Sequence, residues 1–149
     1  VVLLDSTYAG TPANPADKNL AIYTTAGGQV FPVGVNLAAG DTGLFTQCKN
    51  GQTGCGGGAV LANYNGCVGN NELAGTGFDA FDASACTAMQ KFVGGGTGWL
   101  TLRGNVFPGE VMEIRLAVWD TGGHIFDSVV LLDAWEWSLD AAAPGVTPG

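Results

Sequence analysis

Hydrophobic and polar residues alternate most regularly in the last third of the chain. Between residues 110 and 120 apolar side chains fall at every second position: Met112, Ile114, Leu116 and Val118. The charged residues Glu113 and Arg115 stand between the first three of them. Successive side chains of a β-strand point to opposite faces, so this pattern predicts a half-buried strand. The dipeptide Pro108–Gly109 just before it predicts a turn.

Residues 128–137 (SVVLLDAWEW) are apolar on both faces at their start. A continuous apolar run is typical of a strand in the middle of a packed sheet, and we expect one here. Shorter strands are predicted over 1–4 and 98–102, and 19–23 with 30–35 predicts a hairpin around Gly27–Gly28. Pro32 has no amide proton, so it is expected at an edge or a bulge of that hairpin.

Signals for helices are nearly absent, because glycine interrupts most windows long enough for three helical turns. Short strands separated by turns predict an all-β chain, namely a mainly antiparallel β-sandwich of jelly-roll type. We expect one sandwich domain over residues 1–139. Residues 140–149 (DAAAPGVTPG) are interpreted as a tail or linker, or as a strand contributed to a neighbouring molecule.

Composition narrows the possible partners. The chain has 149 residues, 46% of them hydrophobic, with 13 acidic and 5 basic side chains and a net charge of -8. So few cations argue against binding to nucleic acid or to an anionic membrane surface. No apolar run approaches the ~20 residues needed to span a bilayer. No charged leader with a cleavage site is recognised, so any secretion signal is expected to have been removed or to lie outside this chain.

The four cysteines lie in a central region rich in glycine and asparagine: Cys48, Cys55, Cys67 and Cys86. None forms a C-x-x-C pair, which disfavours a structural zinc site. An even number of cysteines in a loop-rich acidic chain favours two disulfides, and the sequence leaves all three pairings open. Disulfides persist in oxidising compartments, so an extracellular or cell-surface location is expected.

Several segments carry a resemblance to a known family: 94–101 (GGGTGWLT), 108–110 (PGE), 114–122 (IRLAVWDTG) and 126–133 (FDSVVLLD). Together they resemble the C-terminal half of the choice-of-anchor (choice-of-anchor L-like) domains of secreted and cell-surface bacterial proteins. Residues 72–78 (ELAGTGF) and 18–22 (KNLAI) fit the same pattern. The resemblance covers most of residues 1–137 and is densest over 94–137.

The chain departs from that family in two respects. Gly123 stands where family members usually have a second aspartate, and family members usually have further strands before the segment that matches Val1–Asp5. A sandwich lacking strands leaves unpaired amides and apolar surface at its edge. We therefore expect neighbouring copies, or a segment outside this chain, to complete the sheet by strand addition. The residues predicted to take part are apolar and lie near the two ends: Val1, Val2, Leu3, Leu4, Ala141, Ala142 and Ala143.

Three aspartates near the loop after residue 119 form a candidate calcium site: Asp120, Asp127 and Asp133. Carboxylates at a loop between strands suit Ca²⁺, which accepts flexible oxygen coordination. The alternative is that these aspartates cap turns by binding their own backbone amides. The glycine at position 123 also removes one carboxylate from any cation site carried over from the family.

Tryptophan is frequent for so short a chain, with four residues. Trp135 and Trp137 would point to the same side of a strand, where flat rings beside acidic or amide groups could bind a sugar. The interpretation that we favour is that the tryptophans fill the core of the sandwich.

Catalysis has little support in the sequence. His124 is the only histidine, and no G-x-S-x-G motif is present. We therefore expect a non-catalytic extracellular structural module that associates with copies of itself, as a surface filament, matrix or adhesion component. The alternative is a glycan-binding or adhesive module that uses calcium.

Overall fold

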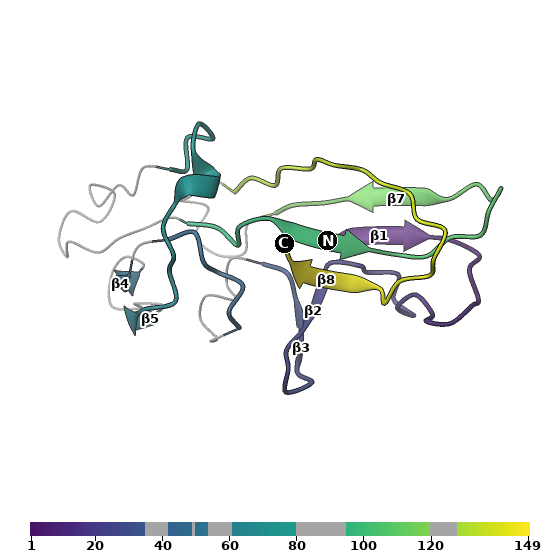
Figure 1. Ribbon diagram of the computed structural model, residues 1–149, viewed down its shortest axis with the longest axis horizontal. Coiled ribbons are helices and arrows are strands. Elements are labelled where there is room, and N and C mark those ends of the chain that lie inside the picture. The colour runs from purple at the N-terminus through teal and green to yellow at the C-terminus, as the bar shows by residue number, and fades with distance from the viewer. Residues whose placement is uncertain (35–41, 49, 54–60, 80–94, 120–127) are drawn as a thin grey trace. The chain divides into compact units, whose positions relative to one another are not determined.

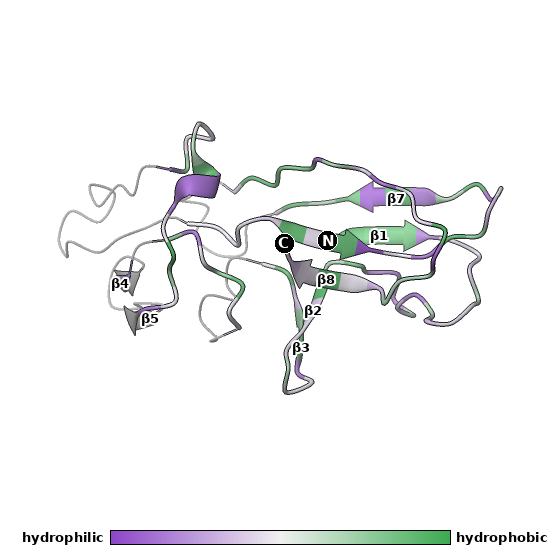
Figure 2. Ribbon diagram, in the orientation of Figure 1, coloured by the Kyte–Doolittle hydropathy of each residue, from purple (hydrophilic) through white to green (hydrophobic). Residues whose placement is uncertain are grey.

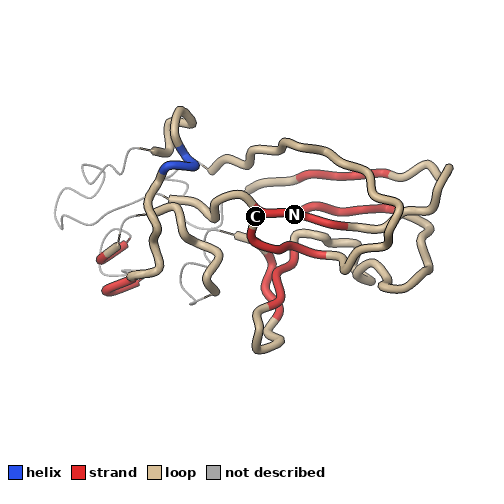
Figure 3. The backbone as a smooth tube through the Cα atoms, viewed as in Figure 1, coloured by secondary structure: helices blue, strands red, loops and turns tan. Residues whose placement is uncertain are grey.

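A computed structural model of the chain describes residues 1–34, 42–48, 50–53, 61–79, 95–119 and 128–149 (Figure 1). The chain divides into two compact units. Unit 1 comprises Val1–Pro32 and Leu102–Val146, and unit 2 comprises Val33–Thr101 and Thr147–Gly149. The described elements are strands apart from one short 3-10 helix, so the expectation of a mainly antiparallel β-protein is confirmed at this level (Figure 3).

In unit 1, strand β1 (Val2–Asp5) pairs antiparallel with β7 (Glu113–Leu116). The register places Leu3 opposite Arg115 and Asp5 opposite Glu113. The other side of β1 is also occupied, because the Leu4 amide donates to the Lys18 carbonyl and the Leu20 amide donates to the Val2 carbonyl. β1 is therefore paired on both sides within its own chain.

The predicted hairpin is confirmed as β2 (Ile22–Thr24) and β3 (Val30–Pro32). Its loop is closed by hydrogen bonds from the Thr25 amide to the Gln29 carbonyl and from the Gly28 amide to the Thr25 carbonyl. Gly28 has φ +78°, a conformation that glycine adopts without a steric penalty. Pro32 lies in an edge strand, as expected, because β3 is terminal in its sheet.

That sheet has four strands in the order β3-β2-β8-β6. β6 spans Leu100–Arg103, close to the strand predicted over 98–102, and β8 spans Gly145–Pro148. β8 runs parallel to β2, with Tyr23 opposite Val146. The end of the segment that the sequence suggested as a tail is thus a strand in the chain's own sheet.

The core of unit 1 is small and apolar. Its buried hydrophobic residues come from β1, from the residues just before β2 and from β8: Leu4, Leu20, Ala21 and Val146. Gly104 lies against this core, since a Cβ atom there would stand 2.6 Å from Leu20 Cδ1 and 2.8 Å from Leu4 Cδ2. A side chain at position 104 would have to displace these leucine side chains, so glycine suits the close packing there.

Unit 2 contains the antiparallel pair β4 (Gly51–Thr53) and β5 (Leu61–Tyr64) and the 3-10 helix Asn71–Leu73. Leu44, Phe45 and Cys48 are buried in it. Gln47 is 3% exposed, and its backbone exchanges hydrogen bonds with Gly96 in both directions. No helix in the described residues of either unit is long and apolar enough to cross a membrane.

Two predictions from the hydrophobic pattern need correction. The strand predicted over 110–120 is confirmed only over Glu113–Leu116; Met112 and Ile114 are half-buried there, but Leu116 and Val118 are exposed. The prediction of a buried central strand over 128–137 is wrong, because these residues form an exposed loop (Figure 3). Apolar periodicity reports what a segment can bury, whereas burial itself depends on whether the fold supplies a partner.

Candidate functional site

Among the described residues, the most unusual surface is residues 128–139, called here the apolar segment. It forms no strand, and all of its residues are exposed. Seven large hydrophobic side chains in it are at least half accessible to solvent: Val129, Val130, Leu131, Leu132, Trp135, Trp137 and Leu139. Figure 2 shows apolar residues along this loop of unit 1. Single exposed hydrophobic residues are ordinary, whereas a contiguous run of them is typical of an interaction site.

The backbone of the apolar segment has few partners. The Ala134 amide donates to its neighbour Asp133 at 2.7 Å, and the Ser138 hydroxyl accepts a hydrogen bond from the Asp140 amide just beyond. In the part of the chain that the structure describes, residues 128–132 make no hydrogen bond to another element. Amides and carbonyls that only water satisfies are free to pair with another strand.

Trp135 and Trp137 form an exposed aromatic pair. Their ring centroids are 5.5 Å apart with an interplanar angle of 73°, an edge-to-face arrangement. The rings are 64% and 67% exposed, and Trp99 and Trp119 are also at least half exposed. The prediction that the tryptophans fill the core is therefore wrong, because all four side chains are at least half exposed.

The candidate calcium site is only partly within the described residues. Asp120 and Asp127 lie outside them, as does His124. The Asp133 carboxylate accepts the amide of Ala134, whose φ is +53°, as an aspartate in a turn does. Among the described residues, no group of three acidic, histidine or cysteine side chains could hold a metal ion.

One disulfide joins Cys48 to Cys67 in unit 2, and the prediction of disulfide bonding is confirmed for this pair. Cys55 and Cys86 lie outside the described residues. The Asn50 side chain supports the bridge, because its Oδ1 accepts the Cys67 amide at 2.9 Å and its Nδ2 donates to the Cys67 carbonyl.

Five of the seven residues predicted to mediate assembly are engaged within the chain, whereas Ala141 and Ala143 are exposed. Val2–Leu4 lie in β1, which is paired on both sides, and Val1 exchanges hydrogen bonds with Ala117. Ala142 is held by the Asn105 side chain, whose Oδ1 accepts its amide and whose Nδ2 donates to its carbonyl. An assembly role for these residues stays a prediction, and the apolar segment is the surface that the structure adds.

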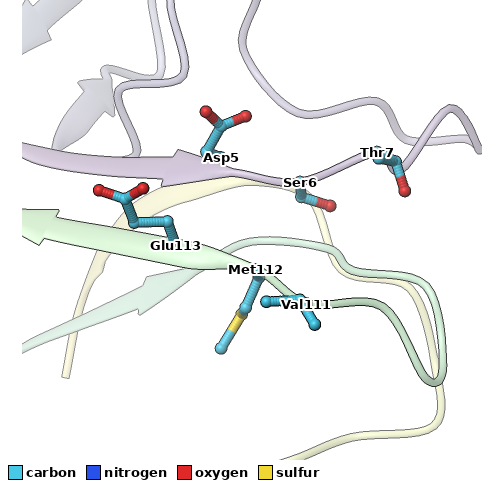
Figure 4. Close-up of a pocket in the computed structure, with 6 residues that line it drawn as sticks. All are labelled: Asp5, Ser6, Thr7, Val111, Met112 and Glu113. Atoms are coloured by element: carbon cyan, nitrogen blue, oxygen red, sulfur yellow. The ribbon is translucent and has the colours of Figure 1, made fainter.

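A shallow pocket of about 250 Å³ lies where β1 and β7 meet in unit 1 (Figure 4). It is lined by Asp5, Ser6, Thr7, Val111, Met112 and Glu113. Asp5 and Glu113 extend to one side of the strand pair and Met112 to the other (Figure 4). Each acid has its own cation: Lys18 Nζ lies 2.9 Å from Asp5 Oδ1, and Arg115 Nε lies 2.5 Å from Glu113 Oε1. The arrangement offsets the repulsion of two carboxylates placed directly opposite each other.

Glu110, beside this pocket, joins the end of β1 to the turn before β7. Its Oε1 accepts the Ser6 hydroxyl and the Phe107 amide, and its Oε2 accepts the Thr7 hydroxyl and amide. Four donors stabilise the charged form, with the Ser6 hydroxyl first, so the pKa of Glu110 is lowered from 4.5 to about 2. A carboxylate this acidic is a poor base toward Ser6, and we interpret the cluster as a structural clamp. Sequence reasoning did not find it.

The Glu110 clamp predicts a specific dependence of stability on pH. The pKa of Glu110 in the folded state lies below its unfolded value. The clamp therefore makes its full contribution to the stability of the folded state above pH 4.5, and this contribution is lost as the pH falls toward about 2. Thermal melts of the Glu110→Gln variant should therefore show a smaller fall in Tm over this pH range than the wild type. Asp140→Asn, an exposed change in the same unit and outside the apolar segment, serves as the control and should follow the wild type. Parallel curves for Glu110→Gln and the wild type would contradict the clamp.

Comparison with models of known protein families, with curated proteins and with solved structures found no match for this chain.

Proposed function

We propose that the chain is a non-catalytic structural module of the extracellular space or cell surface, a β-sandwich of jelly-roll type that associates with copies of itself by strand addition. The observation that carries this proposal is the apolar segment, which is exposed and unpaired in the described structure. Leaving seven large hydrophobic side chains in water is unfavourable, and burying them against another copy would recover roughly 25 cal/mol for each Å² covered.

The chemistry of the apolar segment suits pairing with a strand. Valine, leucine and tryptophan dominate it, and its first five residues contain neither glycine, proline nor charge. Such sequences favour extended pairing when a strand edge is available. Asp133 and Glu136 limit indiscriminate aggregation, because two segments that meet directly would oppose like charges. This combination favours addition to a different surface of the neighbouring molecule.

The location is inferred from the Cys48–Cys67 bridge, since disulfides persist in oxidising compartments. The absence of a catalytic role is inferred from the described site chemistry. The Ser6 hydroxyl is bound to a strongly acidic carboxylate, and the acids of the pocket are paired with cations. Copies of the chain are the partner that we propose, with neither nucleic acid nor a membrane surface as a ligand.

The proposal is tested by the assembly state of the purified chain. Wild-type protein should form oligomers or fibres at micromolar concentration, seen by light scattering and negative-stain electron microscopy. The Val130→Asp/Leu132→Asp variant should stay monomeric, because charges then interrupt the donor strand. These side chains are 59% and 64% exposed, so the free energy of unfolding should change by no more than about 0.5 kcal/mol for each substitution.

A matched variant controls for the added negative charge. Val68→Asp/Val111→Asp changes side chains that are 75% and 98% exposed and lie outside the apolar segment. It should assemble like the wild type. A wild-type chain that remains monomeric at all accessible concentrations would refute self-association.

A glycan-binding or adhesive module, with or without calcium, is the second candidate, and the exposed Trp135–Trp137 pair favours it. Aromatic rings that face solvent with Glu136 between them offer the stacking surface and the hydrogen-bond acceptor that sugars bind. A soluble monomer that is retained on a polysaccharide column, and released when both tryptophans are changed to alanine, would favour this candidate over self-association.

A further inference from the structure

We propose that the outer edge of β7 is the acceptor for the apolar segment of a second copy of this chain, an inference that rests on the self-association proposed above. The acceptor is residues 113–119, called here the β7 edge. It comprises the strand Glu113–Leu116, in which Ile114 is half-buried and the other residues are exposed, and residues 117–119, which are all exposed.

The hydrogen-bond pattern of unit 1 shows which backbone groups of β7 are available. Val1 and Ala117 exchange two hydrogen bonds, so Ala117 directs its amide and carbonyl toward the β1 side. In an antiparallel pair the direction alternates along the strand. Ile114 and Leu116 therefore direct their amides and carbonyls away from β1. In the described part of the sheet β7 has β1 as its one neighbour, so these groups face an open edge (Figure 1).

Other strand edges in the described structure are less suited to receive a donor. β3 is terminal in the four-stranded sheet, but it has three residues and includes Pro32, which lacks an amide proton. β6 is terminal on the other side and ends next to Gly104 and Asn105. Asn105 is tied to Asn14 and Ala142, so an added strand would find only the four residues of β6. β7 contains no proline, and its Ile114 and Leu116 direct their backbone groups away from β1.

The side chains of the β7 edge complement the apolar segment in both hydrophobicity and charge. Leu116, Val118 and Trp119 are each more than half exposed. Arg115 comes just before Leu116, is one of only five basic residues in the chain, and has a side chain that is 64% exposed. Its Nε is paired with Glu113 of the same strand. The apolar segment carries the opposite charge at Asp133 and Glu136. An apolar donor with two acids therefore fits an apolar edge that carries the Arg115 guanidinium, which has further N–H donors beside the Nε that binds Glu113.

Donor and acceptor are different surfaces of the same chain. Contacts of this heterologous kind continue from copy to copy unless the rotation between copies closes a ring. Each molecule would bind one neighbour through its apolar segment and another through its β7 edge. The expected product is a ring or a filament rather than a symmetric dimer.

A charge-exchange experiment tests the acceptor in the full-length chain. Arg115→Glu leaves the β7 edge with two acids and no cation, and Asp133→Arg/Glu136→Arg replaces the acids of the donor with cations that meet Arg115. Each variant alone should require at least about ten-fold more protein to assemble than the wild type, because like charges then meet at every junction. An equimolar mixture should assemble again, since every junction between unlike variants is complementary. Val30→Asp/Val68→Asp makes the same change in net charge as Arg115→Glu at side chains that are 62% and 75% exposed and lie outside the β7 edge, and it should assemble like the wild type.

The possible outcomes separate this inference from the function on which it rests. A wild type that never assembles refutes both. If the wild type assembles and Arg115→Glu assembles equally well, self-association stands and the β7 edge is not the acceptor. If both variants stay monomeric and their mixture does not assemble, pairing of the apolar segment of one copy with the β7 edge of another is refuted. That result is expected if the apolar segment pairs instead with β7 of its own chain. Recovery only in the mixture supports the proposal.

Discussion

Replacing Asn105 with alanine is expected to lower the free energy of unfolding by about 3 kcal/mol, because three hydrogen bonds in a buried site would be lost at about 1 kcal/mol each. Asn105 is 6% exposed. Its Nδ2 donates to the carbonyls of Pro12 and Ala142, and its Oδ1 accepts the Ala142 amide. Its backbone is also bound, since the Asn105 amide donates to Asn14 Oδ1 at 2.9 Å. One side chain thus ties the segment after β6 to the early loop and to the segment before β8.

Urea denaturation would measure this loss. Asn65→Ala provides a control for the same change of residue type at an exposed position in a described loop, and its free energy of unfolding should stay within about 0.5 kcal/mol of the wild type. A loss below about 1 kcal/mol for Asn105→Ala would show that water or local rearrangement replaces the lost partners.

The near-isosteric change Asn105→Asp supplies a second test of the same network. It keeps the oxygen that accepts the Ala142 amide. It replaces the Nδ2 group, which donates to the Pro12 and Ala142 carbonyls, with an oxygen that can only accept when ionised. Burial and the facing carbonyls would raise the pKa of the introduced carboxyl group above its unfolded value. The variant should therefore lose stability as the pH rises through the carboxyl range, which is the opposite direction to the Glu110 clamp.

Removing the Cys48–Cys67 bridge is expected to destabilise the chain by about 3 kcal/mol, the value that loop-closure entropy gives for cysteines 19 residues apart. The bridge lies in unit 2, where Cys48 is 2% exposed and packs with Phe45 and Cys67 in a small apolar cluster. A core this small has little other apolar area to offset the entropy of ordering the chain around it.

The double variant Cys48→Ala/Cys67→Ala, compared with the wild type by urea denaturation under non-reducing conditions, measures this contribution. The single variant Asn50→Ala separates the bridge from its surroundings, because it removes the Asn50 contacts to Cys67 and leaves the bridge intact. It should cost much less than the double variant, about 1 kcal/mol. Equal stability of the double variant and the wild type would mean that the bridge constrains neither state.

Local features of the fold were predictable wherever a few neighbouring residues decide the conformation. The turn at Pro108–Gly109 is present, with the Glu110 amide donating to the Phe107 carbonyl and Gly109 at φ +82°, as a type II turn requires. The β2–β3 hairpin follows for the same reason. The Glu110 clamp was not predictable, because Ser6 and Thr7 are about a hundred residues away and serine and threonine near a strand end carry no signal of a distant carboxylate.

β8 was not predicted as a strand of the chain's own sheet, because its residues give little local reason to form a strand. Gly145–Pro148 reads Gly-Val-Thr-Pro, and glycine and proline are depleted in strands. It becomes one because Tyr23 and its neighbours in β2 offer a pairing edge and because Asn105 fixes the chain at Ala142. The apolar segment shows the reverse case, in which strong strand-forming residues lie in a loop for want of a partner in the described chain.

By itself the sequence determined the β-rich class, the turns, the alternation around β7 and the disulfide bonding, since glycine, proline, cysteine and the two-residue period act over short distances or through composition. Only the tertiary structure decided which segments are covered. It buried Leu4, Leu20 and Val146 together and left Leu131, Leu132 and the tryptophans in solvent. The physical reason is that burial and strand pairing belong to pairs of segments, and a linear pattern specifies only one member of each pair.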